Sequence, residues 1–180
     1  MKKQKKNSIY EKILKARPRM RDPFKNPFPE SDTARHSIWE MLVTRDIDAF
    51  LAADWDMVAG DFVEEGFLGI SGNRDANPDN WRLAFPNLAA YRHEWLKQAK
   101  EFAGESYGED TRNAIFTTTT LEVIEVEGET ALVRKKFDGG IKKADGSFDV
   151  MKWQTLYYCR LHEGRWKISG FTGYLPNPMG

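Results

Sequence analysis

The sequence is poor in the residue types that build metal and redox sites. Its 180 residues include one cysteine, Cys159, and three histidines. A single cysteine excludes an intramolecular disulfide and any multi-cysteine site, and it is typical of a protein from a reducing cytoplasm. His36, His93 and His162 are scattered and lack the spacing of a metal-ligand motif. We therefore expect a cytoplasmic protein with no cofactor and no bound metal.

Long apolar runs are missing as well. No stretch reaches the ~18 apolar residues that predict a membrane-spanning helix, and the charged start lacks the apolar core of a secretory signal. There is no phosphate-binding loop and no nucleophile elbow. Hydrophobic residues make up 41% of the chain and include six tryptophans and eleven phenylalanines, which is enough for one soluble domain with an aromatic core.

The net charge is zero, but the charges are unevenly distributed along the chain. Residues 1–30 hold ten of the 27 basic residues and only three of the 27 acidic ones. A basic arm can bind nucleic acid or an anionic membrane surface, but no aromatic platform or RNA-binding motif accompanies these charges. We therefore divide the chain into a basic, proline-containing arm at 1–30, resting on an acidic surface of its own or a partner's domain, and one domain at 31–180.

Hydrophobic spacing separates this domain into a helical part and a strand part. A helix face begins after Ser31 or Asp32, either of which is a good N-cap, and a longer helix runs from Pro86 to Gly104. From Asn113 onward the apolar residues alternate, which predicts antiparallel strands. The four predicted strands cover 113–126, 130–143, 148–162 and 165–174. The fold class is therefore α+β, with N-terminal helices packed on a mainly antiparallel sheet.

Turn residues set the predicted pairing of the strands. We place two-residue turns at Glu127-Gly128 and Glu163-Gly164. Between the second and third strands, a bulge at Gly139-Gly140 keeps the apolar residues on one face. The predicted pairs are Ile124 with Ala131, Val133 with Tyr157, Phe137 with Trp153, Cys159 with Ile168, and Tyr157 with Gly170.

The two faces of this predicted sheet differ in polarity. One face is apolar at one end and polar at the other. The opposite face is too apolar to be exposed to water; it carries Leu121, Val123, Leu132, Leu156, Tyr158 and Phe171. Because the helices can cover only one face, we expect a homodimer that packs sheet to sheet through the other.

The order of elements resembles the nuclear transport factor 2-like superfamily, which includes SnoaL-like cyclases, limonene epoxide hydrolases, scytalone dehydratases and ketosteroid isomerases. The resemblance covers roughly residues 31–175. It is carried by Ile38-Trp39-Glu40-Met41-Leu42 running into Arg45–Phe50, by Asp61-Phe62 and by Trp166-Lys167-Ile168. It implies a strongly curved sheet that forms a conical small-molecule pocket, commonly in a dimer. Neither the Asp-Arg-Asp set of the epoxide hydrolases nor the His/Asp/Tyr set of the dehydratases maps onto this sequence.

Four residues are candidates for acid–base chemistry: Glu122, Lys135, Tyr157 and Asp61. An inward lysine needs an anion, which Glu122 can supply as a diagonal neighbour, and Tyr157 can donate a hydrogen bond. The alternative is that Lys135 reaches the rim and stays solvated. Asp61 follows the third helix, where related pockets place polar groups. Asp46 and Asp54 are interpreted as helix caps.

The expected pocket lining combines aromatic side chains with threonines. These residues are Trp39, Trp55, Phe62, Thr120, Phe137, Trp153, Thr155 and Thr172. The sequence thus predicts a protein that binds a small molecule, working as a cofactor-independent lyase, isomerase or hydrolase. The alternative is a non-catalytic dimeric binding or scaffold protein whose basic arm engages an acidic partner.

Overall fold

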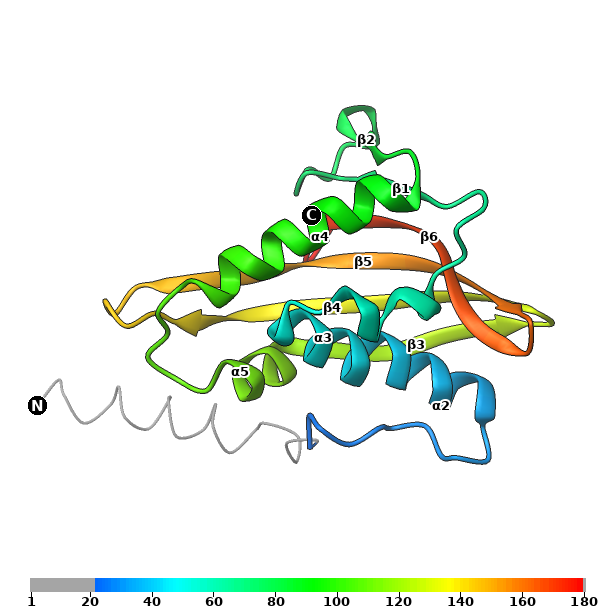
Figure 1. Cartoon of the computed structure of the whole chain (residues 1–180), viewed down its shortest axis with the longest axis horizontal. Coiled ribbons are helices and arrows are strands. Elements are labelled where there is room, and N and C mark those ends of the chain that lie inside the picture. Colours follow the sequence, from blue (N-terminus) through cyan, green and yellow to red (C-terminus); the bar gives the residue numbers. More distant parts are fainter. Residues whose placement is uncertain (1–21, 180) are drawn as a thin grey trace, which may run out of the picture.

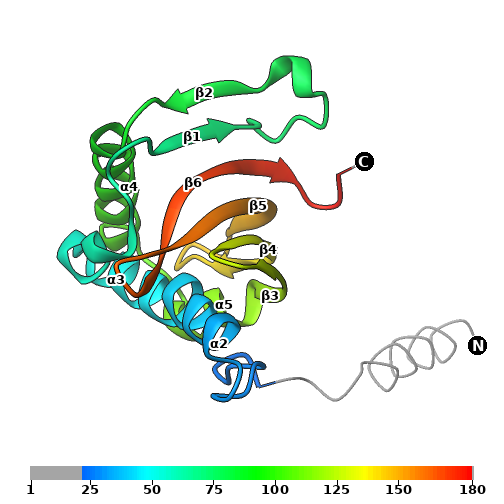
Figure 2. The same cartoon turned by 90° about the vertical axis from the view of Figure 1, so that its right-hand side faces the viewer.

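The computed structural model describes residues 22–179, which form a curved six-stranded sheet with helices on its concave side (Figures 1 and 2). The longer helical elements are α2 (Thr33–Trp39), the π-helix η1 (Glu40–Arg45), α3 (Asp46–Ala52), α4 (Leu88–Ala103) and α5 (Thr111–Thr118). Three short 3-10 turns are η2 (Trp55–Met57), η3 (Ala59–Asp61) and η4 (Pro78–Asn80). Among these residues, no helix is long and apolar enough to cross a membrane.

The strands are β1 (Leu68–Ser71), β2 (Arg82–Phe85), β3 (Thr119–Glu127), β4 (Thr130–Lys142), β5 (Phe148–His162) and β6 (Arg165–Pro176). They lie in the order β2-β1-β6-β5-β4-β3. Only β1 and β6 are parallel neighbours, and the other pairs are antiparallel. Figure 2 shows the sheet curving around the helices without closing into a barrel. The predicted α+β class with a mainly antiparallel, curved sheet is therefore confirmed.

The first three helical elements are continuous in the chain from Thr33 to Ala52. Asp32 begins them as predicted, because its side chain accepts a hydrogen bond from the backbone N–H of Arg35. Asp46, however, is not a helix cap. It lies inside the continuous helical segment and makes no side-chain capping bond there, so its carboxylate can extend sideways toward the sheet.

The β4–β5 pairing is the one predicted, but its cause differs. Phe137 lies opposite Trp153, and the same register continues through Gly139 to the end of both strands. The predicted bulge at Gly139-Gly140 is therefore wrong. The extra residue lies in the turn 144–146, which is closed by a 2.8 Å bond from the Lys143 N–H to the Ser147 carbonyl. Gly146 takes the left-handed conformation that this turn requires, with φ of 88°.

The start of β3 differs most from the prediction. Residues 111–118 form helix α5, capped by Asp110, where a strand was expected from Asn113. The turn lies one residue later than predicted, and Ile124 consequently pairs with Val133. A bulge between Leu121 and Val123 then reverses the alternation. As a result, Leu121 is buried and Glu122 is exposed.

Two irregularities also shift β6 against β5. The predicted Cys159–Ile168 pair is present, but a shift after it places Tyr157 opposite Phe171 instead of Gly170. Phe171 therefore faces the helices. A second shift follows Thr172 and ends near Tyr174, whose φ of 54° marks the irregular backbone. The predicted outer apolar face thus loses Leu121 and Phe171, which are both buried in the core.

The end of the predicted arm packs on the domain. The ring of Phe24 lies 4.7 Å from that of Phe116, and the guanidinium of Arg112 lies over the Phe24 ring at 5.3 Å. Phe28 also packs against the core. Residues 1–21 lie outside the described part of the chain, so the arm and its boundary at residue 30 stay a prediction.

Candidate functional site

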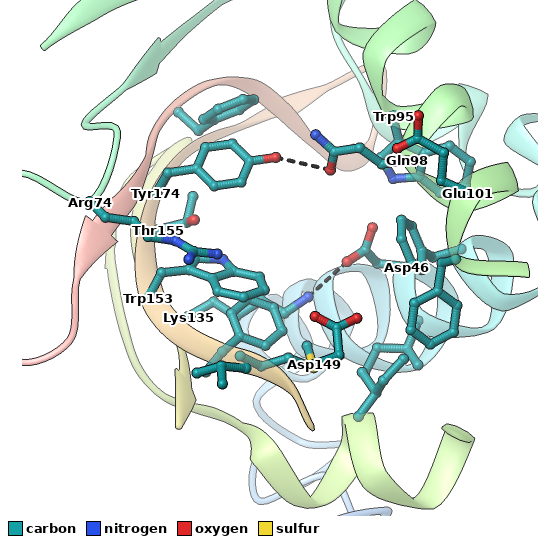
Figure 3. Close-up of a pocket in the computed structure, with 18 of the residues that line it drawn as sticks. Asp46, Arg74, Trp95, Gln98, Glu101, Lys135, Asp149, Trp153, Thr155 and Tyr174 are labelled. Atoms are coloured by element: carbon teal, nitrogen blue, oxygen red, sulfur yellow. Dashed lines mark hydrogen bonds and ion pairs between the residues drawn. The ribbon is translucent and has the colours of Figure 1, made fainter. Parts of the chain in front are cut away.

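A cavity of about 480 Å³ lies between the concave face of the sheet and helices α3 and α4 (Figure 3). Ten of its 22 lining residues are aromatic, so the walls favour the rings of an apolar ligand. The aromatic lining residues are Phe50, Tyr91, Trp95, Phe102, Tyr107, Phe137, Trp153, Tyr157, Phe171 and Tyr174.

An ion pair between β4 and α3 forms part of the cavity wall. Nζ of Lys135 lies 2.7 Å from Oδ2 of Asp46 and also donates to the backbone carbonyl of Leu42 in η1. The lysine side chain is only 1% exposed, whereas that of Asp46 is 28% exposed. Lys135 is therefore enclosed by its two acceptors, and Asp46 is the partner that a ligand can reach.

The second carboxylate oxygen of Asp46 has no hydrogen-bond partner among residues 22–179. Figure 3 shows the carboxylate held by Lys135 on one side and open to the cavity on the other. Charge compensation by Lys135 makes this carboxylate tolerable in a largely apolar wall. The pair therefore holds one acceptor oxygen in place for a ligand.

Tyrosine hydroxyls share the cavity with this carboxylate. Burial raises the pKa of Tyr157 well above its usual range, and the nearby charge of Asp46 raises it further. The pKa of Tyr91 is raised in the same way, by burial first and then by Tyr157 and Asp46. Both phenols are therefore protonated at neutral pH and can donate hydrogen bonds.

The outer part of the cavity carries further charged side chains. Arg74, in the loop between β1 and β2, lies over the ring of Trp153 at 5.5 Å. Asp149 of β5 accepts a hydrogen bond of 3.1 Å from the hydroxyl of Tyr107. Glu101 extends from α4 and also lines the cavity.

The structure brings five of the predicted residues together in this cavity: Lys135, Phe137, Trp153, Thr155 and Tyr157. All five lie on β4 and β5. The lysine does not stay solvated at the rim, because its side chain is almost fully buried. The anion that it binds is Asp46 in place of the predicted Glu122.

Three residues that were predicted to line the site lie outside it, because strand irregularities turn them outward. Glu122 and Thr120 are exposed, and they line a separate hollow of about 140 Å³ beside Trp39. The bulge in β3 accounts for both. Thr172 lies on the opposite face from the cavity, where its hydroxyl is 2.6 Å from that of Tyr158.

The remaining predicted residues are structural neighbours of the cavity. Trp55 and Phe62 stack on each other at 5.0 Å within the core. Asp61 is 2% exposed and does not line the cavity. Two hydrogen bonds of 2.6 and 2.8 Å join it to Arg45, and a third of 3.2 Å joins it to Arg165. Asp61 therefore links the helices to β6 through arginine pairs.

Sequence reasoning missed Asp46, although a signal was present. Asp46 continues the buried positions Ile38 and Leu42 at intervals of four residues. A carboxylate on the apolar stripe of a helix needs a partner inside the fold. The same stripe that predicted the helix therefore contained the residue that pairs with Lys135.

Comparison with known proteins supports the fold. No protein-family model matches the sequence, and no match was found among curated proteins. A nuclear transport factor 2-like superfamily protein from Salmonella enterica aligns with a TM-score of 0.53 and 14% identity over 81% of this chain and 93% of its own. A protein of unknown function with a cystatin-like fold from Nostoc punctiforme aligns with a TM-score of 0.53 and 11% identity over 82% and 93%.

A third solved structure, of a protein of unknown function from Mycobacterium tuberculosis, aligns with a TM-score of 0.52 and 16% identity, covering 82% of this chain and 75% of that one. The chain therefore has the nuclear transport factor 2-like, cystatin-like fold, as its order of elements predicts. At these identities the likeness shows the fold alone, so function must be argued from the cavity.

Proposed function

We propose that this protein binds a ring-containing small molecule in the cavity and moves a proton on it, with Asp46 as the base. The observation that carries the proposal is the position of the Asp46 carboxylate. One oxygen is bound by a buried ammonium group, and the other faces a cavity lined by aromatic rings. A carboxylate in such a place is suited to general base catalysis.

The tyrosines complete the proposed chemistry. When Asp46 removes a proton next to a carbonyl, negative charge develops on the carbonyl oxygen. The hydroxyl of Tyr157 or Tyr91 donates a hydrogen bond to that oxygen, and the apolar walls strengthen this interaction. Lys135 positions Asp46 and is itself only 1% exposed, so the carboxylate is the member of the pair that meets the ligand. This arrangement favours a lyase or an isomerase that uses no cofactor.

A flat probe with one acidic carbon–hydrogen bond tests the proposal. When a base removes that proton from nitrobenzisoxazole, the electrons form a nitrile, the nitrogen–oxygen bond breaks, and a coloured phenolate is released. We expect the protein to accelerate this reaction about a hundredfold or more over the same concentration of acetate, with saturation and with competition by naphthylethanol. A rate no higher than that of acetate would contradict the proposal.

A homodimer through the outer face of the sheet is also proposed. Val123, Leu132 and Tyr158 lie on three neighbouring strands and are 45%, 42% and 36% exposed. Light scattering is expected to give twice the chain's 20.8 kDa, and Leu132→Glu is expected to halve that mass without unfolding the protein. If the wild type and Leu132→Glu have the same mass, whether that of a monomer or that of a dimer, the proposed interface is wrong.

The exposed outer face also supports the alternative function, a non-catalytic dimeric binding or scaffold protein. In that case the basic arm engages an acidic partner, and the cavity binds ligand without turnover. The proposed compartment is the cytoplasm in either case. It is supported by the cysteine content, since the one cysteine, Cys159, cannot form an intramolecular disulfide.

A further inference from the structure

Most of the charged side chains that line the cavity are paired with an opposite charge, and the unpaired remainder is negative. The lining has four carboxylates, on Asp46, Glu101, Glu105 and Asp149, and two cations, on Lys135 and Arg74. Asp46 compensates Lys135, and Lys143, just outside the lining, lies 2.6 Å from Glu105. Glu101, Asp149 and Arg74 then remain, so one negative charge of the lining is left without a matching positive charge.

Two carboxylates of the same cavity keep a hydrogen-bond acceptor for a ligand. Lys135 already donates to Leu42 and Asp46, and Arg74 is stacked over Trp153. Asp46 and Asp149 each have one carboxylate oxygen with no partner among residues 22–179. A ligand that satisfies these oxygens must bring hydrogen-bond donors of its own.

The aromatic walls favour a positive charge as well as an apolar ring. The face of an aromatic ring attracts a cation within about 6 Å of its centroid. Tyr91, Tyr157 and Tyr174 all line the cavity, and burial raises the pKa of each above the usual tyrosine value, so these rings stay neutral. Both the aromatic rings and the carboxylates therefore favour a ligand that carries a positive charge.

We infer that the ligand is an amine, with its ring among the aromatic side chains and its ammonium group directed toward Glu101 and Asp149. This inference rests on the proposed function in one respect, that the cavity is the ligand site. Figure 3 shows Arg74 and Glu101 on opposite sides of the cavity. Arg74 repels a cation from its own side, so the charge distribution sets the orientation of an amine in the cavity.

Three probes with the same ring and different end groups test the inference: naphthylethylamine, naphthylethanol and naphthylpropionate. Measured by calorimetry at low salt, the amine is expected to bind about tenfold more tightly than the alcohol, and the carboxylate more weakly than either. High salt is expected to reduce the preference, since exposed charges are screened. Equal or tighter binding of the carboxylate overturns the inference, as does an amine that does not bind at millimolar concentration.

Removing a negative or a positive charge from the cavity is expected to change the affinity for the amine in opposite directions. Glu101→Gln is expected to weaken amine binding about two- to fivefold, and Arg74→Gln to strengthen it by a similar factor, because each removes one charge near the ligand. Neither change is expected to alter binding of naphthylethanol. Glu65→Gln is the matched control, because it removes an exposed carboxylate that does not line the cavity. Effects with the reverse signs, or equal effects on the alcohol, contradict the inference.

The inference and the proposed function fail in different ways. If the amine preference and its charge dependence are found but nitrobenzisoxazole is not turned over, the proton-transfer function is wrong and the ligand class holds. If the probe is turned over and the carboxylate binds as well as the amine, only the ligand class is wrong.

Discussion

Replacing Asp46 by asparagine is expected to lower the free energy of unfolding by about 3–5 kcal/mol, because it leaves the ammonium group of Lys135 buried without an anion. The lysine side chain is only 1% exposed, so water solvates its charge poorly. Its other partner, the carbonyl of Leu42, carries no full charge. The cost does not come from lost packing, because asparagine and aspartate have nearly the same volume.

Removing the lysine instead is expected to cost less. Lys135→Met takes away the buried charge and keeps an apolar chain of similar length, while Asp46 is 28% exposed and can be hydrated from the cavity. We expect a loss of about 1–3 kcal/mol, which reflects the two lost hydrogen bonds. The double variant Lys135→Met/Asp46→Asn is then expected to lie within about 1 kcal/mol of Lys135→Met.

Urea denaturation of the four proteins measures this asymmetry as a double-mutant cycle. The expected sign is decisive: adding Lys135→Met to Asp46→Asn should restore stability. If Asp46→Asn alone were as stable as the wild type, Lys135 would have another source of charge compensation. In that case the pair would not be what holds the carboxylate in the cavity.

The sequence predicted this lysine better than it predicted its partner. Alternation along β4 places Lys135 on the inner face, and an inward lysine requires an anion. The choice of Glu122 was wrong because alternation alone does not locate a bulge, and the one between Leu121 and Val123 turns Glu122 outward. The actual partner lies 89 residues earlier in the chain, in a helix whose position against the sheet is set by tertiary packing.

Irregular strand pairing, which alternation does not predict, also explains which other site residues were predicted correctly. The predicted residues that reach the cavity lie on β4 and β5, where the predicted register was right. The residues that were misplaced lie on β3 and β6, which have irregular pairing, and in the helical half of the chain. Arg74 and Tyr91 were missed because their positions depend on how a loop and α4 pack over the sheet. Periodicity predicted the elements, and local irregularities decided which side chains meet.

The largest expected effect on activity is the loss of proton transfer when Asp46 is replaced. With nitrobenzisoxazole as the probe, the rate is expected to fall about 10²–10⁴-fold, the usual contribution of a positioned general base. Asp46→Asn alone is a poor test, because its expected instability also lowers the amount of folded protein. The comparison that isolates the base is Lys135→Met against Lys135→Met/Asp46→Asn.

Both proteins in that comparison lack the buried ammonium group, so they are expected to have similar stability, and they differ only in whether a carboxylate faces the cavity. Lys135→Met is expected to retain a substantial part of the rate, because Asp46 is still present although less firmly held. The double variant is expected to fall to the rate of acetate in solution. Affinity for naphthylethanol serves as the control for an intact cavity, since neither change removes an aromatic wall. Equal rates in the two variants, with unchanged affinity for the alcohol, would show that Asp46 is not the base and that the ion pair has a structural role alone.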